Sequence, residues 1–227
     1  MLPLNKILQE LEKPHLCPDC KEVTIEHPGL CDKCADVANS RTVSQVMPQQ
    51  PRETIIPPDM RWARFDSALL AERVSNKCAI NLAVSAAERF KVPTPRSVIF
   101  CGPTGVGKTS LAAAIMRKLE GFSIAQNAFW IKANDLGRAR MDSPLGEEPK
   151  AVRKARKASL LVLDDLGGEC NQGIEVIRDV VHYRRDYCLP TIYTTWATDE
   201  QLSACYGEGV ARRILEFSDV IAVRKMP

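Results

Sequence analysis

Long apolar stretches are missing from this 227-residue sequence. No apolar run reaches the roughly 18 residues that a membrane-spanning helix needs, so we expect no contact with a membrane. The first residues, MLPLNKILQELEK, also lack the continuous apolar segment and the small-residue cleavage site of a signal peptide. We therefore expect a cytoplasmic protein.

A strong charge of one sign, an internal repeat and a low-complexity tract are missing too. The net charge of +3 is too small to indicate nucleic-acid binding by itself, so the positions of the charges matter more than their sum. Hydrophobic residues make up 45% of the chain and charged residues 26%, as in an ordinary globular protein. The length suits one α/β domain with a small appendage.

Cysteine is abundant, but its spacing is unlike that of a secreted disulfide scaffold. Of nine cysteines, four form two C-x-x-C pairs, Cys17/Cys20 and Cys31/Cys34. This is a zinc-ribbon spacing, in which four thiolates complete a closed tetrahedral site. A redox-active pair is the competing interpretation, and His15 and His27 are expected to be bystanders.

The other cysteines are scattered through apolar surroundings, where a thiol acts as a small hydrophobe. They are Cys78, Cys101, Cys170, Cys188 and Cys205. The sequence thus predicts a zinc-binding module over residues 1–38, which is too short to fold without its metal. Residues 39–60 are rich in proline and small polar residues, and are expected to be a linker.

From residue 61 onward, apolar strands alternate with helical patterns. Strands are expected at 97–101, in 128–136, at 159–167 and 190–196, and near the end of the chain, with helices between them. This alternation predicts an α/β fold, in which a parallel sheet is covered by helices on both faces.

A glycine-rich segment, GPTGVGKT (residues 102–109), fits the P-loop pattern G-x-x-x-x-G-K-[ST]. A strand before it and a helix after it disfavour a chance glycine-rich turn. The glycines let backbone N–H groups surround phosphates, Lys108 contacts the β- and γ-phosphates of ATP, and the Thr109 hydroxyl binds Mg²⁺. The predicted phosphate-binding residues are Gly102, Pro103, Thr104, Gly105, Val106, Gly107, Lys108, Thr109 and Ser110.

Two acidic residues end the apolar run LLVLDDLG. Asp164 is expected to hold the Mg²⁺, and Asp165 to orient or deprotonate the attacking water. A pair of loop-capping acids is the alternative, but a P-loop about fifty residues earlier favours catalysis.

Together these motifs resemble the DnaC-like and IstB-like AAA+ ATPases over residues 57–224. The segments that carry the resemblance are GPTGVGKT, LLVLDDLG, the arginine-rich turn after it, PTIYTTW and GEGVARRILE. The segment PPDMRWARFDS also resembles the part of these proteins that lines the adenine pocket. The resemblance implies a three-layer AAA+ domain over residues 61–227 without a helical lid.

The resemblance further implies an arginine finger in GVARRILE, which reaches the γ-phosphate bound by a neighbouring subunit. Arg213 fits best by position, with Arg212 as the other candidate, and the contact would require self-association or another ATPase. A pair of solvated arginines is the alternative.

In the resembling family, the strand PTIYTTW usually ends in an asparagine that holds the attacking water. Trp196 stands there instead, and an indole N–H can only donate a hydrogen bond. Thr195 could serve one residue earlier. We therefore expect secure ATP binding, with hydrolysis that is slow or stimulated by a partner.

A basic segment over residues 138–157 is similar in position to the part of loader ATPases that contacts single-stranded DNA. Arg138, Arg140, Lys150, Arg153 and Lys154 are the predicted contacts. No aromatic residue lies among them, so binding would depend on phosphates and on salt. A solvated helix face is the alternative.

The resemblance implies an ATP-dependent loader of a replicative DNA helicase, whose zinc module grips the helicase. A transposase helper of the IstB type and a non-hydrolysing, ATP-bound adaptor remain as alternatives. The expected cofactors are ATP, Mg²⁺ and Zn²⁺.

Overall fold

The chain divides into two units, Met1–Glu53 and Thr54–Pro227, which are described separately. The computed structural model describes residues 15–16, 24–25, 55–74, 76–92, 96–144, 146–168 and 171–225. In the first unit, β1 (His15–Leu16) pairs antiparallel with β2 (Thr24–Ile25), and His15 lies opposite Ile25. The predicted zinc ligands, Cys17, Cys20, Cys31 and Cys34, lie outside the described residues.

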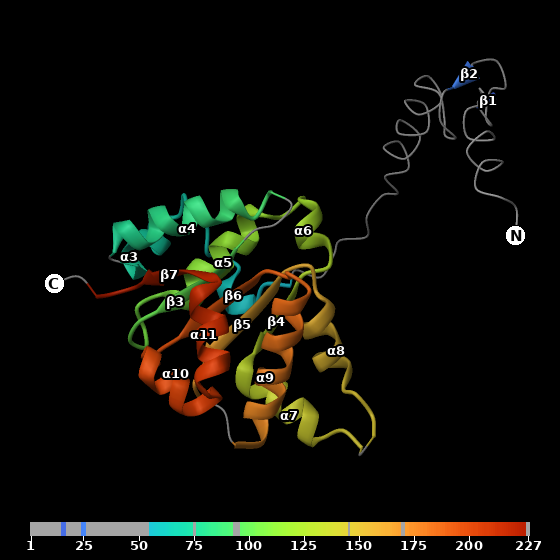
Figure 1. Cartoon of the computed structure of the whole chain (residues 1–227). Helices are drawn as coiled ribbons and strands as arrows, with labels where there is room; N and C mark the ends of the chain where they lie inside the picture. The colour runs from blue at the N-terminus through green and yellow to red at the C-terminus, as the bar shows by residue number, and fades with distance from the viewer. Residues whose placement is uncertain are drawn as a thin grey trace, which may run out of the picture. The chain divides into compact units, whose positions relative to one another are not determined.

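The second unit is built on a five-stranded sheet in which all described pairs are parallel. The strands are β3 (Ser97–Cys101), β4 (Phe129–Lys132), β5 (Leu161–Leu166), β6 (Thr191–Thr195) and β7 (Ser218–Ala222). Their order is β4-β5-β6-β3-β7, so β6 separates the P-loop strand β3 from the acidic strand β5 (Figure 1). The predicted parallel sheet and its strands are confirmed.

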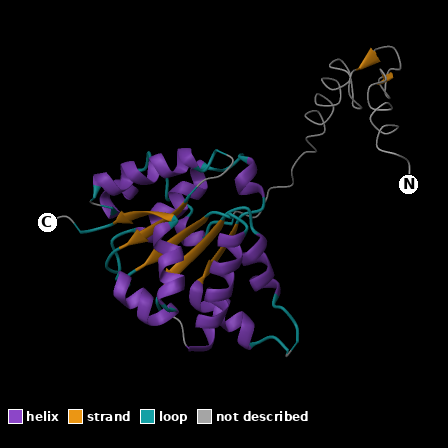
Figure 2. Cartoon of the chain, in the orientation of Figure 1, coloured by secondary structure: helices purple, strands orange, loops and turns teal. Residues whose placement is uncertain are grey.

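Helices cover both faces of this sheet and make three layers (Figure 2). One face carries the 3₁₀ turn η1 (Pro58–Met60), α3 (Ala68–Arg73), α4 (Lys77–Arg89), α5 (Lys108–Lys118) and α6 (Ser123–Gln126). The other carries α7 (Ala133–Met141), α8 (Lys150–Lys157), α9 (Asn171–Asp186), α10 (Asp199–Tyr206) and α11 (Glu208–Glu216).

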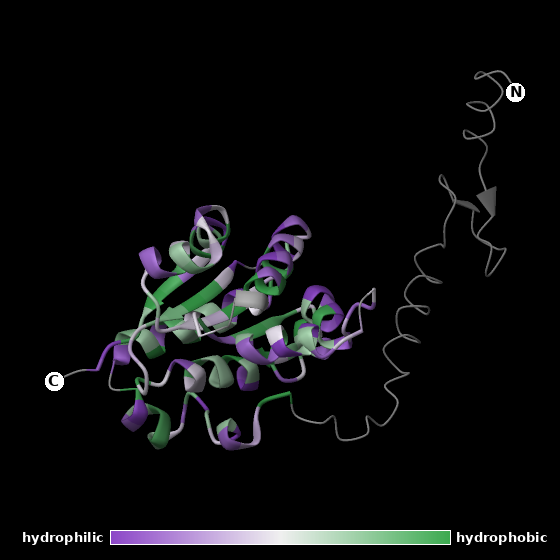
Figure 3. Cartoon of the chain, turned by 90° about the horizontal axis from the view of Figure 1, so that it is seen from below, coloured by the Kyte–Doolittle hydropathy of each residue, from purple (hydrophilic) through white to green (hydrophobic). Residues whose placement is uncertain are grey.

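Alternating side chains in the strands explain the two cores. Val98 and Phe100 of β3 pack with α4 and α5, whereas Ile99 between them packs with α9 and α11. Leu161 and Leu163 of β5 face the second core in the same way. A strand buried on both faces therefore consists of consecutive apolar residues. Figure 3 shows the central strands coloured as hydrophobic.

Residues 55–60, predicted to belong to the linker, lie within the second unit and pack in its first core. Ile56 is buried in the first core, and Met60 packs against it. Among the described residues, no helix is both long and apolar enough to cross a membrane.

A buried arginine joins three elements of the second unit. Arg184 of α9 is only 1% exposed. Its guanidinium donates to the Thr191 hydroxyl at 2.8 Å, to the carbonyls of Ala155 and Ala158 at 2.8 Å, and to the Pro190 carbonyl at 2.5 Å. It thereby satisfies carbonyl groups at the end of α8, where the helix leaves acceptors without an internal partner.

Candidate functional site

The P-loop connects β3 to α5 at the carboxyl end of the sheet, and two of its glycines are required by close contacts. Gly107 begins α5 with φ +93°, and a Cβ there would lie 2.5 Å from Val74 Cγ2. A Cβ on Gly102 would lie 2.0 Å from the Val223 carbonyl oxygen. Side chains at either position would therefore displace the loop from the segments packed around it.

Lys108 is held by its own loop. Its ammonium group donates to the carbonyls of Gly102 at 2.8 Å and Pro103 at 2.7 Å, and the residue is 8% exposed. Burial lowers the pKa of Lys108, while the charges of Asp165 and Asp164 act in the opposite direction. The loop thus keeps a cation in position for a phosphate group.

Asp164 is the acceptor of two hydroxyl groups. Its Oδ1 atom accepts hydrogen bonds from Thr194 at 2.6 Å and Thr109 at 3.0 Å, and the residue is 2% exposed. Burial raises the pKa of Asp164, and these two hydrogen bonds partly oppose that rise. The carboxylate and the Thr109 hydroxyl are adjacent oxygen ligands of the kind that Mg²⁺ prefers, so this pair fits the predicted ion.

Asp165 takes a different direction because β5 is irregular there. The pairing of β5 with β6 shifts between Leu163 and Leu166, and Asp165 has φ +64°. Its N–H donates to the Thr194 hydroxyl at 2.8 Å, and its side chain is exposed. The bulge therefore buries one carboxylate and presents the next to the cavity.

These residues line a cavity of about 310 Å³. Its lining comprises Pro57, Asp59, Met60, Arg73, Thr104, Gly105, Gly107, Lys108, Thr109, Ser110, Lys132, Asp164, Asp165 and Thr194. The segment before the first helix contributes Pro57, Asp59 and Met60, as the resemblance implied. Of the other predicted P-loop residues, Gly102 and Pro103 accept from Lys108, and Val106 is buried in the first core.

Three lining residues were not predicted from the sequence. Lys132 is the last residue of β4 and lies opposite Asp164 in the sheet register. Arg73 ends α3, and its guanidinium lies 5.1 Å from the centre of the Trp62 ring. Thr194 is the third. Lys132 and Thr194 are polar residues at the carboxyl ends of parallel strands, and this position could have indicated that they belong to the site.

Thr195, the predicted hydroxyl beside the attacking water, does not line the cavity. It is fully buried, donates to the Leu166 carbonyl at 2.9 Å and accepts from the Ala197 N–H at 3.0 Å. Trp196 follows the end of β6, is 44% exposed and does not line the cavity either. Because side chains alternate along a strand, the hydroxyl that faces the acidic pair belongs to Thr194.

Arg213 lies on α11 and does not line the P-loop cavity of its own chain. Its guanidinium makes one long contact, 3.4 Å, to the Gly209 carbonyl. Arg212 is exposed and lies 3.9 Å from Glu216. The structure therefore brings neither arginine to the phosphate site within one chain.

The predicted DNA contacts lie on α7 and α8. Val152 and Ala155 bury one side of α8, whereas Lys150, Arg153 and Lys154 are exposed. Arg153 lies 3.4 Å from Glu148, and Arg156 is paired with Glu148 and Asp179. On α7, Arg138 is exposed and Arg140 is half-buried. The outer face of α8 therefore keeps Lys150 and Lys154 without an acidic partner among the described residues.

No cluster of three or more His, Cys, Asp or Glu side chains in the described part of the chain could hold a metal ion. Burial, followed by the charge of Asp199, raises the pKa of the Cys101 thiol to about 11. This cysteine stays protonated near neutral pH, in agreement with the expectation of an inert thiol.

Comparison with known families gives one match, to the family described as "ATPase family associated with various cellular activities (AAA)", over residues 98–181. This segment runs from the P-loop strand through the acidic pair into α9. No curated protein matches the sequence significantly.

Several solved structures share the fold. A structure of the DnaC helicase loader has a TM-score of 0.60 at 23% identity, covering 74% of this chain and 100% of that one. A structure of DnaI has a TM-score of 0.61 at 24% identity, covering 74% and 94%. The replication initiator DnaA, bound to AMPPCP and single-stranded DNA, has a TM-score of 0.59 at 16% identity, covering 75% and 51%.

Proposed function

We propose that this protein, which carries an AAA ATPase domain, uses ATP to load a replicative DNA helicase onto single-stranded DNA. The observation that carries the proposal is a complete P-loop and acidic pair in a domain that shares its fold with nearly the whole of the DnaC and DnaI structures. The DnaC structure is described as a helicase loader.

In the proposed reaction, Lys108 leaves its loop carbonyls and contacts the β- and γ-phosphates. Thr109 and Asp164 would hold Mg²⁺, which when bound neutralises phosphate charge. Asp165 orients or deprotonates the attacking water from its exposed position. Lys132 lines the same cavity and is proposed to add a second cation near the terminal phosphate.

Hydrolysis is proposed to be slow until a partner completes the site. Trp196 offers no acceptor where an asparagine is usual in the resembling family, and the Thr195 hydroxyl is fully used inside the fold. We propose that Thr194 instead holds the acidic pair in place. Arg213 of a second chain, or of another ATPase, would supply the missing positive charge at the phosphate.

The remaining parts of the chain are proposed to bind the partners. The zinc module, held by Cys17, Cys20, Cys31 and Cys34, is proposed to dock the helicase. The cysteine spacing supports the zinc site, and the resemblance to the loader family supports the docking role. Single-stranded DNA is proposed to contact Lys150, Arg153 and Lys154 on α8, with Arg138 and Arg140 on α7. The similarity of the fold to a DNA-bound DnaA structure supports DNA contact.

The test is a loading experiment with the replicative helicase from the same source. Purified full-length protein is mixed with the helicase and single-stranded DNA in ATP or in ADP, and helicase retained on DNA is measured. The proposal is supported if the helicase stays on the DNA only with ATP and only when residues 1–38 are present. The amount of retained helicase should also fall with the Lys108→Ala variant. Absence of any helicase complex in either nucleotide would overturn it, and a transposase would then be tested.

A variant pair separates the loader from the adaptor alternative. Asp165→Asn keeps a side chain that tolerates positive φ but removes the carboxylate. Loss of loading with ATP binding intact indicates that hydrolysis is required. Full loading by Asp165→Asn would favour a non-hydrolysing adaptor.

A further inference from the structure

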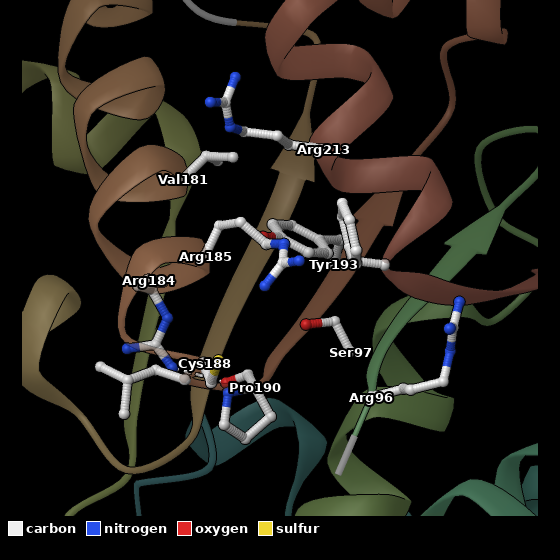
Figure 4. A pocket seen from close by; sticks show the side chains of 11 residues that line it. Arg96, Ser97, Val181, Arg184, Arg185, Cys188, Pro190, Tyr193 and Arg213 are labelled. Atoms are coloured by element: carbon white, nitrogen blue, oxygen red, sulfur yellow. Dashed lines mark hydrogen bonds between the residues drawn. The ribbon is translucent and has the colours of Figure 1, made fainter. Parts of the chain in front are cut away.

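A second cavity, of about 200 Å³, lies between α9 and α11 at the amino ends of the strands. Ser97 begins β3 and Pro190 immediately precedes β6, so this cavity is at the opposite end of the sheet from the P-loop. The two cavities share no lining residue. Figure 4 shows Arg185 reaching from α9 toward Tyr193 and Ser97, and Arg213 reaching from α11 toward Val181.

The charged residues around this cavity are all arginines. Arg96, Arg184, Arg185 and Arg213 line it, and no aspartate or glutamate does. Arg96 is paired with Asp219 at 3.3 Å. The other three guanidinium groups have no acidic partner within 4 Å among the described residues.

Arg185 and Arg213 also keep most of their hydrogen-bonding capacity. Arg185 stacks 3.4 Å from the centre of the Phe217 ring, which fixes its plane and leaves its N–H edge available. Arg213 makes only the long contact to Gly209. Ser97 accepts from the Thr191 N–H at 2.9 Å, so its own O–H can donate.

Three like charges around one small cavity repel one another, and a charge removed from water needs a partner. Arg184 shows this cost directly, because burial lowers its pKa to about 10. A doubly charged oxyanion would offset the repulsion, and guanidinium groups match its oxygens with paired N–H donors.

We propose that this cavity binds a phosphate-type oxyanion through Arg185 and Arg213, with the Ser97 hydroxyl as a further donor. Two sources share this chemistry: inorganic phosphate in solution, and the terminal phosphate of a nucleotide held by a second copy of the chain. Only the second source depends on the proposed function.

The test uses the full-length Lys108→Ala variant, so that phosphate cannot bind the P-loop lysine. Thermal unfolding is measured in sodium phosphate and in sodium chloride of equal ionic strength. At a phosphate concentration about ten times the Kd, we expect the Tm to be about 3 °C higher in phosphate. Adding Arg185→Gln or Arg213→Gln should abolish that difference, whereas Arg212→Gln, one residue away on the exposed side of α11, should keep it.

Equal Tm values in phosphate and chloride, or a phosphate effect that survives both glutamine variants, overturn the proposal. Because Arg185→Gln also removes the contact with Phe217, Arg185→Lys is included, and it should retain part of the phosphate effect through its charge. ATP binding by the wild-type P-loop is measured separately, so failure here leaves the proposed function untouched.

The source of the oxyanion is decided by ATP turnover over a range of chain concentrations. If the phosphate belongs to ATP on a second copy, ATP turnover per chain should rise with chain concentration, and Arg185→Gln should remove that rise. If turnover is unchanged while the phosphate effect on Tm is lost, the ligand is free phosphate.

Discussion

At the residue scale, Asp164 is a buried acid whose ionised form the fold disfavours. Burial raises its pKa, so the ionised carboxylate lowers the stability of the metal-free domain above that raised pKa. Below the ordinary aspartate pKa of about 4, the group is protonated in both folded and unfolded chains and this cost disappears.

Asp164→Asn is therefore expected to raise the free energy of unfolding of the ATP-free protein at pH 7. The gain should shrink as the pH falls toward about 4, because the wild-type carboxyl becomes neutral there. Urea unfolding across this pH range measures the difference. The exposed Asp165→Asn variant is the control, and an equal gain in that variant would show that burial is not the cause.

Thr194 connects the two acidic residues, since it accepts from the Asp165 N–H and donates to the Asp164 carboxylate. Thr194→Val keeps the shape but removes both hydrogen bonds, and should cost about 1–3 kcal/mol of stability. It should also lower ATP turnover. Thr194→Ser is expected to restore turnover, and a valine variant with wild-type turnover would remove Thr194 from the site.

Lys132 is expected to act on the terminal phosphate. Lys132→Ala should lower kcat for ATP at least about tenfold while changing nucleotide affinity little, as for other groups that stabilise developing charge. Single-turnover hydrolysis with bound ATP separates the two quantities. Lys157→Ala, an exposed lysine on α8, is the matched control. If the affinity for ATP instead falls by the same factor as turnover, Lys132 contacts bound ATP and does not act specifically on the transition state.

At the element scale, Arg184 shows how one side chain can hold a helix end against a sheet. Arg184→Met should leave the carbonyls of Ala155 and Ala158 unsatisfied, remove a donor to Pro190, and cost at least about 3 kcal/mol. Thermal unfolding tests this. The exposed Arg212→Met should unfold almost as the wild type does, and a similar stability of both variants would contradict the role assigned to Arg184.

The elements of the second unit were predictable because their signals are local. Strands buried on both faces, such as β5, give short apolar runs, and the P-loop fixes a strand, a turn and a helix at once. The sheet order has no local signal, since pairing depends on residues far apart in the chain. The same reason explains why the role of Arg184 could not be predicted: its acceptors come from other elements.

The lining of the cavity was predicted where a motif fixes both residue and direction, as for Lys108, Thr109 and Asp164. It was missed where direction depends on strand register. Thr194 and Thr195 are adjacent and chemically alike, and only the pairing of β6 with β5 determines which hydroxyl faces the cavity. The direction of the Lys132 side chain depends in the same way on the register of β4 with β5, which places Lys132 opposite Asp164.

At the scale of the whole molecule, the second unit contains both hydrophobic cores and every residue of the P-loop cavity. A protein that consists of residues 54–227 is therefore expected to fold alone. Its Tm should lie within about 3 °C of the Tm of the same unit in the full-length chain. Its affinity for ATP should be unchanged. Calorimetry and nucleotide titration measure both, and loss of ATP binding would show that the first unit contributes to the site.

The contacts of Lys108 with its own loop have a consequence for phosphate binding. The Gly102 and Pro103 carbonyls accept hydrogen bonds from Lys108, so a phosphate that binds this lysine must replace these two acceptors. For this lysine, binding exchanges hydrogen bonds at nearly constant number, so its contribution to affinity should come mainly from charge. The backbone around Lys108 is therefore expected to change little when a phosphate binds, because the loop already holds this side chain in position.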